Sequence, residues 1–541
     1  MFIRVFFCRS ARLSLRLYPE KRTSMLNKCF CATCVGVEAV VVTVEVDLSV
    51  GIGIHLVGLP DSAVRESLLR VITALTSYGF RIPGRKIVVN LAPADIRKEG
   101  SAYDLPIALG MLAASEQIRP VDCERFVIMG ELALDGRIRP VNGVLPVALQ
   151  ARADGFSACI FPAASAGEAS VVEGLAVYGV SSLAEAITVL TRREECAHLL
   201  IRPQAEPGPV LRSGNDFRQV RGQRVAKRGL EIAAAGGHNL ILVGAPGSGK
   251  SMMASCLPSI LPPMTRDEAI ETGKVYSVAG RGGQFTGLLR ERPFRAPHHS
   301  TSLVSLIGGG PQAGPGEISL AHNGVLYLDE VAQFSRSLLD ALRQPLEDGR
   351  VSISRARYKV DYPAHFMLVA SMNPCPCGYY GDGEGRCTCS RGAVEGYLSR
   401  ISGPMMDRFD LQVWVRSLSA VELLGLSGGA GDQAPEESSA VIAERVMRAR
   451  AVQEARLAGE GIFTNAAMNA RQIERFCALS AACRKTLEQI LERMGLSARA
   501  YSRILKVART LADLAGSEDI QPAHLLEAAG FRFLDRRRIV D

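Results

Sequence analysis

Short β-rich runs alternate with helical patterns between residues 25 and 197. The runs VVVTVEVDL (residues 40–48) and KIVVNLAP (residues 86–93) are rich in β-branched residues and predict strands. Between them, SAVRESLLRVITALTSYGF repeats its apolar residues at helical spacing and predicts an amphipathic helix. The alternation therefore indicates an α/β domain over residues 25–197.

Two stretches rich in Gly, Pro and polar residues divide the rest of the chain. IRPQAEPGPVLRSGNDF predicts a linker over residues 198–217, and LSGGAGDQAPEESS predicts a second linker over residues 418–439. A second α/β block occupies residues 218–417, and residues 440–541 repeat Ala, Leu, Arg and Glu at helical spacing. The predicted fold class is thus a multidomain α/β protein with a helical domain at its C-terminal end.

The second α/β block begins with a phosphate-binding pattern. In NLILVGAPGSGKS an apolar strand runs into G-x-x-x-x-G-K-S and then into a helical segment, which is the context that a P-loop requires. Backbone N–H groups of such a loop close around phosphate oxygens, while the lysine reaches the β- and γ-phosphates and the serine binds Mg²⁺. The predicted nucleotide-binding residues are Gly244, Ala245, Pro246, Gly247, Ser248, Gly249, Lys250 and Ser251.

Two later strands end in polar residues suited to nucleotide hydrolysis. The buried run 325–328 ends in Asp329 and Glu330, and HFMLVASMNP ends in Asn373 and a proline. Because α/β sheets bind ligands at the carboxyl ends of their strands, these side chains are expected beside the P-loop. Asp329 then completes the Mg²⁺ site, Glu330 polarises the attacking water, and Asn373 orients that water through hydrogen bonds.

Composition narrows the class of protein only slightly. The chain has 541 residues and a net charge of +8, which permits a nucleic-acid partner without indicating one. No apolar run approaches the roughly 20 residues that span a bilayer, so no membrane association is expected.

The arginine-rich residues 1–24 resemble a transit peptide, but translation from Met25 is the favoured interpretation. Fourteen cysteines without a secretory signal indicate a reducing, cytoplasmic setting.

Two groups of cysteines stand out. Cys29, Cys31 and Cys34 fall within the expected first strand, where we interpret them as packing residues. Between residues 374 and 390 an insertion directly after Asn373 carries Cys375, Cys377, Cys387 and Cys389. Four thiolates can complete a tetrahedral structural zinc site in a Gly-rich loop that has almost no apolar core. The alternative is a surface loop of reduced, unligated cysteines.

The motifs taken in order resemble those of a known family. GAPGSGKS, VLYLDE, ASMNP and MMDRFDL are similar to an AAA+ ATPase, while RPFRAPHHSTS and PGEISLAHNGVLYLDE resemble its magnesium-chelatase-like branch. NPCPCGYYGD and SARAYSRILKVARTLADL narrow the resemblance to the ComM/YifB family, over nearly the whole chain from residue 25.

That resemblance implies further roles. Arg408 matches the arginine finger that reaches the nucleotide of a neighbouring subunit, and Arg499 matches the sensor arginine of a helical lid, with Arg503 as the fallback. A finger acting between subunits implies a ring, and the family implies a homo-hexamer. Residues 25–197 resemble a Lon protease domain whose Ser–Lys dyad is missing, because the matching positions are Ala102 and Leu145.

The remaining pattern concerns DNA. Residues 347–366 predict a β-hairpin whose basic tip carries Arg350, Arg355, Arg357 and Lys359, and in similar ring helicases such a hairpin contacts the DNA backbone in the pore. The combined expectation is an ATP-driven hexameric motor using ATP and Mg²⁺, and similar to the ComM branch-migration helicase of recombination or natural transformation. The alternatives are a motor subunit of a magnesium-chelatase type and a factor related to ATP-dependent proteases.

Overall fold

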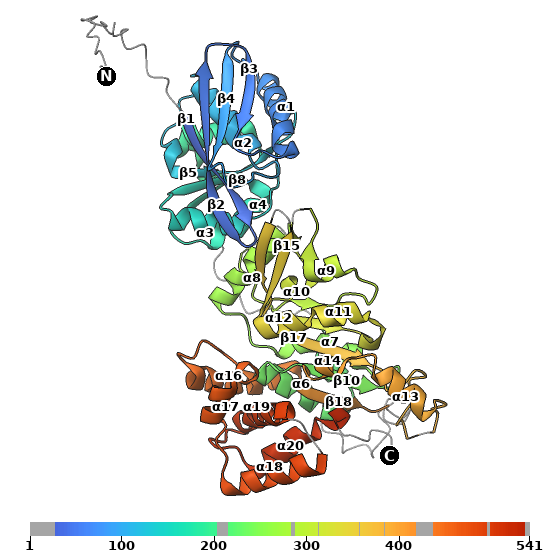
Figure 1. Cartoon of the computed structure of the whole chain (residues 1–541). Coiled ribbons are helices and arrows are strands. Elements are labelled where there is room, and N and C mark those ends of the chain that lie inside the picture. Colours follow the sequence, from blue (N-terminus) through green and yellow to red (C-terminus); the bar gives the residue numbers. More distant parts are fainter. Residues whose placement is uncertain are drawn as a thin grey trace, which may run out of the picture.

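The computed structural model describes residues 27–202, 215–282, 287–311, 313–355, 358–383, 385–417, 436–494 and 498–535. Figure 1 shows an elongated molecule, with the N-terminal α/β unit at one end and the C-terminal helices at the other. The second α/β unit lies between them, so it adjoins both the N-terminal unit and the C-terminal helices.

A seven-stranded sheet forms the N-terminal unit, in the order β3-β4-β2-β1-β5-β8-β9. The strands are β1 (Asn27–Val35), β2 (Glu38–Ser49), β3 (Gly53–Val57), β4 (Lys86–Ala92), β5 (Phe126–Ile128), β8 (Ala158–Pro162) and β9 (Ala176–Val180). The helices are α1 (Ser62–Ser77), α2 (Asp104–Ala114), α3 (Val144–Ala153), α4 (Ala163–Ala166) and α5 (Leu183–Thr191), and β6 (Glu131–Leu132) pairs with β7 (Ile138–Arg139). The two strands and the helix expected from periodicity are confirmed as β2, β4 and α1.

The cysteines of the first strand are packing residues, as expected. Cys29 and Cys31 lie in β1 with exposed fractions of 1% and 0%, and both belong to the apolar core of the N-terminal unit. Their thiols therefore contribute to the core rather than to a metal site.

A parallel five-stranded sheet forms the second α/β unit, in the order β11-β14-β17-β10-β18. The strands are β10 (Leu240–Gly244), β11 (Phe294–Arg295), β14 (Val325–Leu328), β17 (Met367–Met372) and β18 (Leu411–Val415). All four pairings are parallel, so β10, β14 and β17 end at the same edge of the sheet. The helices of this unit are α6 (Arg224–Gly236), α7 (Lys250–Cys256), α8 (Arg266–Val278), α9 (Leu303–Ile307), α10 (Glu317–Leu320), α11 (Arg336–Ala341), α12 (Arg343–Asp348), α13 (Arg391–Leu398) and α14 (Gly403–Met406).

Two antiparallel hairpins project from this unit. The shorter one pairs β12 (Gly308–Gly309) with β13 (Gly314–Pro315), and the longer one pairs β15 (Arg350–Arg355) with β16 (Tyr358–Pro363). The longer hairpin is the one that the sequence predicts. It buries Val351, Ile353, Val360 and Tyr362 and exposes Ser352, Ser354, Lys359 and Asp361, so its two faces follow the period of two that a half-buried hairpin requires.

The N-terminal unit is fastened to the second unit at α8 and at the long hairpin. The N–H groups of Gly143 and Leu145, at the start of α3, donate to the backbone and side-chain oxygens of Ser277 over 3.0 and 3.2 Å. At the β1–β2 turn, a Cβ built on Gly36 would come within 2.7 Å of a methyl group of Val360. The turn can approach the hairpin so closely because Gly36, with φ +66°, has no side chain.

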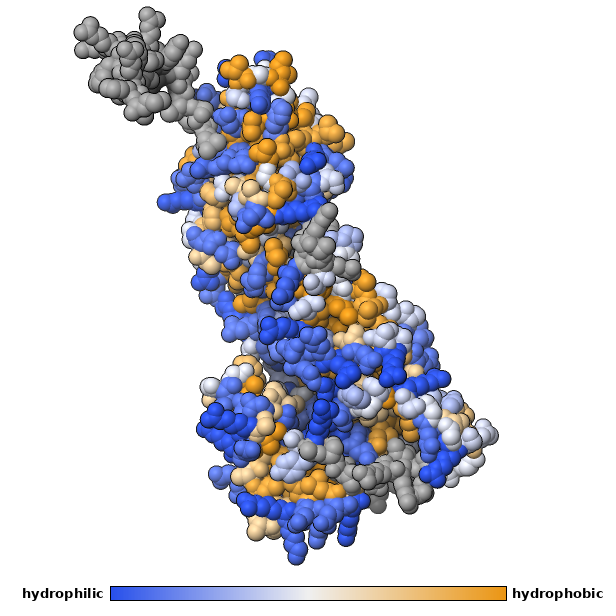
Figure 2. Space-filling view, in the orientation of Figure 1, coloured by the Kyte–Doolittle hydropathy of each residue, from blue (hydrophilic) through white to orange (hydrophobic). Residues whose placement is uncertain are grey.

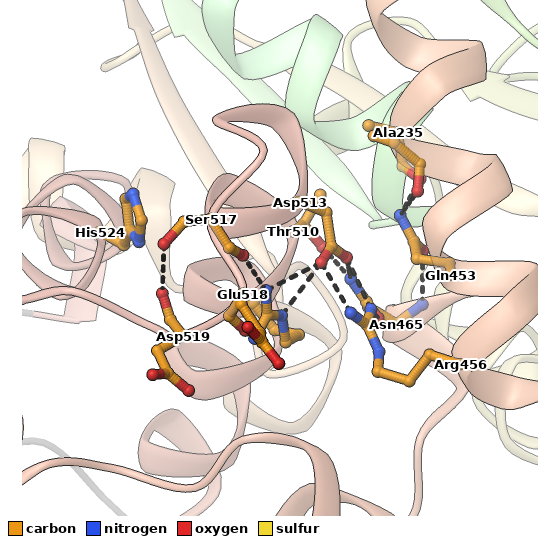
Figure 3. A network of polar contacts seen from close by, with 12 residues as sticks. Ala235, Gln453, Arg456, Asn465, Thr510, Asp513, Ser517, Glu518, Asp519 and His524 are labelled. Carbon is orange, nitrogen blue, oxygen red and sulfur yellow. Dashed lines mark hydrogen bonds and ion pairs between the residues drawn. The ribbon is translucent and has the colours of Figure 1, made fainter.

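The C-terminal segment consists of α16 (Ser439–Leu457), α17 (Ala470–Phe476), α18 (Ala481–Met494), α19 (Ala498–Leu514) and α20 (Pro522–Gly530). A buried network centred on Asp513 joins α16 to α19 (Figure 3). Asp513, with a fully buried side chain, accepts from Arg456 over 2.6 and 2.7 Å and from Asn465 over 2.8 Å. Gln453 extends the network by donating to the carbonyl of Ala235 at the end of α6 over 3.0 Å, which ties the segment to the second unit.

We expect Asp513→Asn to lower the free energy of unfolding by about 2 kcal/mol, because the amide cannot neutralise the arginines that the buried carboxylate binds. Chemical denaturation monitored by circular dichroism would measure this change. Asp519→Asn, in the turn before α20, is the control and should leave stability nearly unchanged, because Asp519 bonds to Ser517 through its backbone carbonyl, which the substitution keeps. Equal effects of the two substitutions would contradict the central place of Asp513.

Figure 2 shows hydrophilic and hydrophobic side chains interspersed over the face drawn, with hydrophobic ones visible on the N-terminal unit, on the second unit and on the C-terminal helices. No helix within the described ranges combines the length and the apolar character needed to cross a bilayer.

Candidate nucleotide site

The P-loop lysine is buried against its own loop. Lys250 donates to the carbonyls of Gly244 and Ala245 over 2.8 and 2.9 Å, and to Oδ1 of Asn373 over 3.2 Å. Burial lowers the pKa of Lys250, which the charges of Asp329 and Glu330 partly oppose. The ammonium group is therefore held at the carboxyl ends of β10 and β17 by weak neutral acceptors, which phosphate oxygens can replace.

Asp329 is fixed by three hydroxyl donors. Ser251 donates to its Oδ2 over 3.0 Å, Tyr327 donates to Oδ1 over 2.9 Å, and Ser371 also donates to Oδ1. Burial raises the pKa of Asp329, but these hydrogen bonds outweigh burial and the resulting pKa lies below its ordinary value. The carboxylate therefore stays ionised, and its contact with Ser251 brings together two of the oxygen ligands that Mg²⁺ would need.

Glu330 is positioned by its backbone. Its φ of +52° lies in the left-handed region, and its N–H donates to Oγ of Ser371 over 3.1 Å. Its side chain accepts from Nε2 of Gln333 over 2.6 Å. A glutamate rarely adopts this backbone conformation without support, so the surrounding contacts hold the carboxylate in place beside Asp329.

An open pocket of about 700 Å³ lies beside Asn373. Besides Asn373, its lining includes Gln333, Arg336, Tyr397 and Arg400. The pocket thus brings Asn373 and Gln333, the hydrogen-bond donor to Glu330, together with two arginines, which suits an anionic group.

Sequence reasoning missed Ser371 and Tyr327. Each lies two residues before a predicted site residue, Ser371 before Asn373 in β17 and Tyr327 before Asp329 in β14. Alternate residues of a strand share a face, so a polar residue two positions before a predicted site residue points to the same side of the sheet. That spacing is the signal by which Ser371 and Tyr327 could have been predicted.

Arg408 and Arg499 lie together, and their described contacts do not involve the P-loop. Arg408 forms an ion pair with Glu347, while Nη1 of Arg499 lies 3.3 Å from Oδ2 of Asp407. Arg503 lies 3.7 Å from Asp407 and 3.4 Å from Asp410. The structure therefore groups the expected finger with the expected sensor arginine, and none of their described ion pairs involves Lys250.

The expected DNA contacts are described in part. Lys359 is exposed on the solvent face of the β15–β16 hairpin. Arg350 is also exposed, but the prediction that it lies at the tip is wrong, because it pairs with Pro363 at the base of the hairpin. Arg357 lies outside the described residues, and Arg355 is described only by its backbone in β15. Oγ of Ser352 donates to Asp361 over 2.5 Å, which occupies the acidic side chain of that face.

The four cysteines of the insertion converge. Their sulfur atoms all lie within 4.8 Å of one another, and Sγ of Cys375 is 3.3 Å from that of Cys377 and 3.8 Å from that of Cys387. A Cys₄ zinc site with Zn–S bonds of about 2.3 Å separates its sulfurs by about 3.8 Å, so the donor set fits zinc. The loop rests on the P-loop, since a Cβ on Gly378 would meet Pro246 at 2.7 Å.

Three family models match the chain. The model described as magnesium chelatase, subunit ChlI, matches residues 216–423. The model described as subunit ChlI of Mg-chelatase matches residues 44–165, and the one described as the C-terminal part of that subunit matches residues 436–532. Together they match parts of both α/β units and of the helical segment.

Similar proteins extend over nearly the whole chain. Competence protein ComM of Haemophilus influenzae is 45% identical over 505 residues, covering 93% of this chain and 96% of that protein. YifB of Salmonella typhimurium is 42% identical over 502 residues, with the same coverage of 93% and 96%. The chloroplastic magnesium-chelatase subunit ChlI of Glycine max is 25% identical over 160 residues, which cover 25% of this chain and 37% of that protein.

The parallel sheet with its P-loop fits the AAA+ fold of magnesium chelatases, a family that uses ATP and Mg²⁺. Because the identity to ComM and YifB proteins exceeds 40% over almost their full length, the chain belongs to the ComM/YifB family of magnesium-chelatase-like ATPases.

Proposed function

We propose that the chain is the subunit of a homo-hexameric motor that hydrolyses ATP to move branched or single-stranded DNA. The observation that carries this proposal is the convergence of Lys250, Asp329, Glu330 and Asn373 at one sheet edge in a chain similar throughout to a competence protein. The exposed basic side chains of the β15–β16 hairpin, Arg350 and Lys359, would contact DNA phosphates. By this proposal the motor drives branch migration in recombination or natural transformation.

ATP hydrolysis follows from the site chemistry. The ammonium of Lys250 would leave the carbonyls of Gly244 and Ala245 for the β- and γ-phosphates. Ser251 and Asp329 would hold Mg²⁺, which would supply positive charge to offset the negative charge of the phosphate groups. Glu330 would accept a proton from the attacking water while the amide of Asn373 orients it.

The active ring needs two subunits for each nucleotide. Arg408 of one copy would approach the γ-phosphate bound by the next, because its described ion pair is with Glu347 and not with a residue of its own P-loop. We propose that Arg499, which shares Asp407 with Arg503, acts on that same neighbouring nucleotide from the helical lid. An arginine suits both positions because it stays charged and presents a planar fork to phosphate oxygens.

ATP-dependent movement of a synthetic four-way junction tests this function. We expect the wild-type chain to resolve the junction into duplexes and Glu330→Gln to leave it intact, with ATP hydrolysis by the wild type rising when DNA is added. Arg350→Ala with Lys359→Ala should weaken DNA binding and its salt dependence while leaving hydrolysis without DNA unchanged. If the rate of ATP hydrolysis is the same with and without DNA and the junction does not move, the proposal of a DNA motor is contradicted.

The two alternatives have less support. The similarity to the chelatase subunit of Glycine max covers only 25% of this chain, against 93% for ComM. For a Lon-type protease, the position expected to carry the catalytic lysine holds Leu145, which is 5% exposed. Ser101 donates its hydroxyl to Glu131. We therefore assign the Lon-like unit no proteolysis.

We further propose that the insertion binds a structural zinc ion in a cytoplasmic protein. The N–H of Tyr380 donates to Sγ of Cys375 over 3.4 Å, the kind of contact that stabilises a metal-bound thiolate. The cysteines of the described residues are free thiols, as a reducing cytoplasm would keep them.

The purified chain should carry about one zinc ion per subunit, and Cys387→Ser should lose it. Metal analysis by plasma mass spectrometry under reducing conditions measures both values. Cys159→Ser, a change of a buried cysteine in β8, is the matched control and should retain the metal. Metal-free wild-type protein that still hydrolyses ATP would contradict the zinc proposal.

A further inference from the structure

The environment of Arg408 is crowded with positive charge. Burial and the charges of Arg503, Arg499 and Arg343 lower the pKa of Arg408. The Arg408 side chain is 16% exposed, and its Nε has no hydrogen-bond partner among the described residues. The Arg408 guanidinium is therefore held in a place where neighbouring cations repel it.

Glu347 supplies the carboxylate that compensates this repulsion. It forms an ion pair with Nη2 of Arg408, and its own side chain is 59% exposed. An ion pair with one exposed partner is weak and easily exchanged. The contact can therefore hold Arg408 in a free subunit and still yield to the stronger charge of a phosphate.

Glu347 is also linked to the hairpin that we assign to DNA. It lies in the last turn of α12, and only Asp348 and Gly349 separate it from β15. The N–H of Gly349 donates to the carbonyl of Pro345 over 2.9 Å, and its own carbonyl accepts from Ala364, after β16, over 2.8 Å. Gly349 thus fastens the end of α12 to the base of the hairpin, so displacement of the hairpin moves Glu347.

We propose that Glu347 is a latch on the finger arginine: without DNA it retains Arg408 within its own subunit, and DNA at the hairpin withdraws Glu347 and frees Arg408 for the neighbouring nucleotide. Glu347 is accordingly a positioning residue that couples DNA contact to hydrolysis. This inference rests on the proposed function, because it assigns DNA to the hairpin and the finger role to Arg408.

The test compares steady-state hydrolysis with and without a four-way junction. Glu347→Gln should raise the rate without DNA by about three- to fivefold, the shift that one partly exposed ion pair can produce, and should reduce stimulation by DNA correspondingly. Glu347→Asp, which keeps the charge, should retain stimulation. Glu195→Gln removes the ion pair with Arg192 in the N-terminal unit and is the control with unchanged rates, because the Glu195 side chain is 60% exposed, nearly as that of Glu347 is.

The double variant Glu347→Gln with Arg408→Ala identifies the partner. Its rate should equal that of Arg408→Ala alone, since a latch has no effect without the arginine that it holds. If Glu347→Gln raises the rate both with and without Arg408→Ala, the latch is overturned. It is also overturned if DNA stimulates the wild type but Glu347→Gln alone leaves the rate without DNA unchanged. A wild type that DNA does not stimulate contradicts the proposed function instead.

Discussion

Glu330→Gln should bind ATP with nearly wild-type affinity and hydrolyse it more slowly by a factor on the order of 10² or more. The amide has the size of the carboxylate but cannot accept a proton from the attacking water. The phosphate ligands predicted at Lys250 and Ser251 do not depend on Glu330, so binding should persist. Fluorescent-nucleotide titration and a phosphate-release assay measure the two quantities separately.

The structure supplies a control for this result. Gln333 donates to Glu330 over 2.6 Å but does not itself accept a proton from water, so Gln333→Ala should reduce the rate less than Glu330→Gln does. Thermal unfolding should show that both variants are folded. Near-normal hydrolysis by Glu330→Gln would show that another group activates the water.

The sequence was sufficient to predict the sheet edge at which the nucleotide site forms. The strands β10, β14 and β17 each contain four or more consecutive apolar residues, and a predicted site residue lies at the carboxyl end of each, so they could be recognised from local pattern. The hairpin was equally visible, because Val351 and Ile353 alternate with Ser352 and Ser354 on a half-buried surface.

Relationships between distant segments were not visible in this way. Glu347 precedes Arg408 by sixty-one positions, and nothing in α12 indicates that its last turn faces the arginine. The grouping of Arg499 with Arg408 depends on how α19 packs, which the buried contacts of Asp513 with α16 determine (Figure 3). Such contacts follow from tertiary packing, which a pattern of apolar positions does not specify.

Arg408→Ala should lower ATP hydrolysis by a factor on the order of 10³, because an arginine finger stabilises charge on the transferred phosphoryl group. ATP binding should be retained, since the described contacts of Arg408 involve no P-loop residue. Arg408→Lys keeps the charge but loses the planar fork, so its rate should fall between those of the wild type and Arg408→Ala. Steady-state hydrolysis at a protein concentration that supports ring assembly would measure these rates.

Mixing Arg408→Ala with Glu330→Gln decides whether the finger acts between subunits. In a mixed ring, a nucleotide bound by the Arg408→Ala subunit meets an intact Glu330 and receives an intact finger from a Glu330→Gln neighbour. Random assembly of equal amounts makes about a quarter of the interfaces complete, so hydrolysis should recover although each variant alone is nearly inactive. If the mixture forms rings but stays as inactive as its components, Arg408 does not act on the nucleotide of the neighbouring subunit. The argument that the active unit is a closed ring, which depends on an arginine acting between subunits, would then fail.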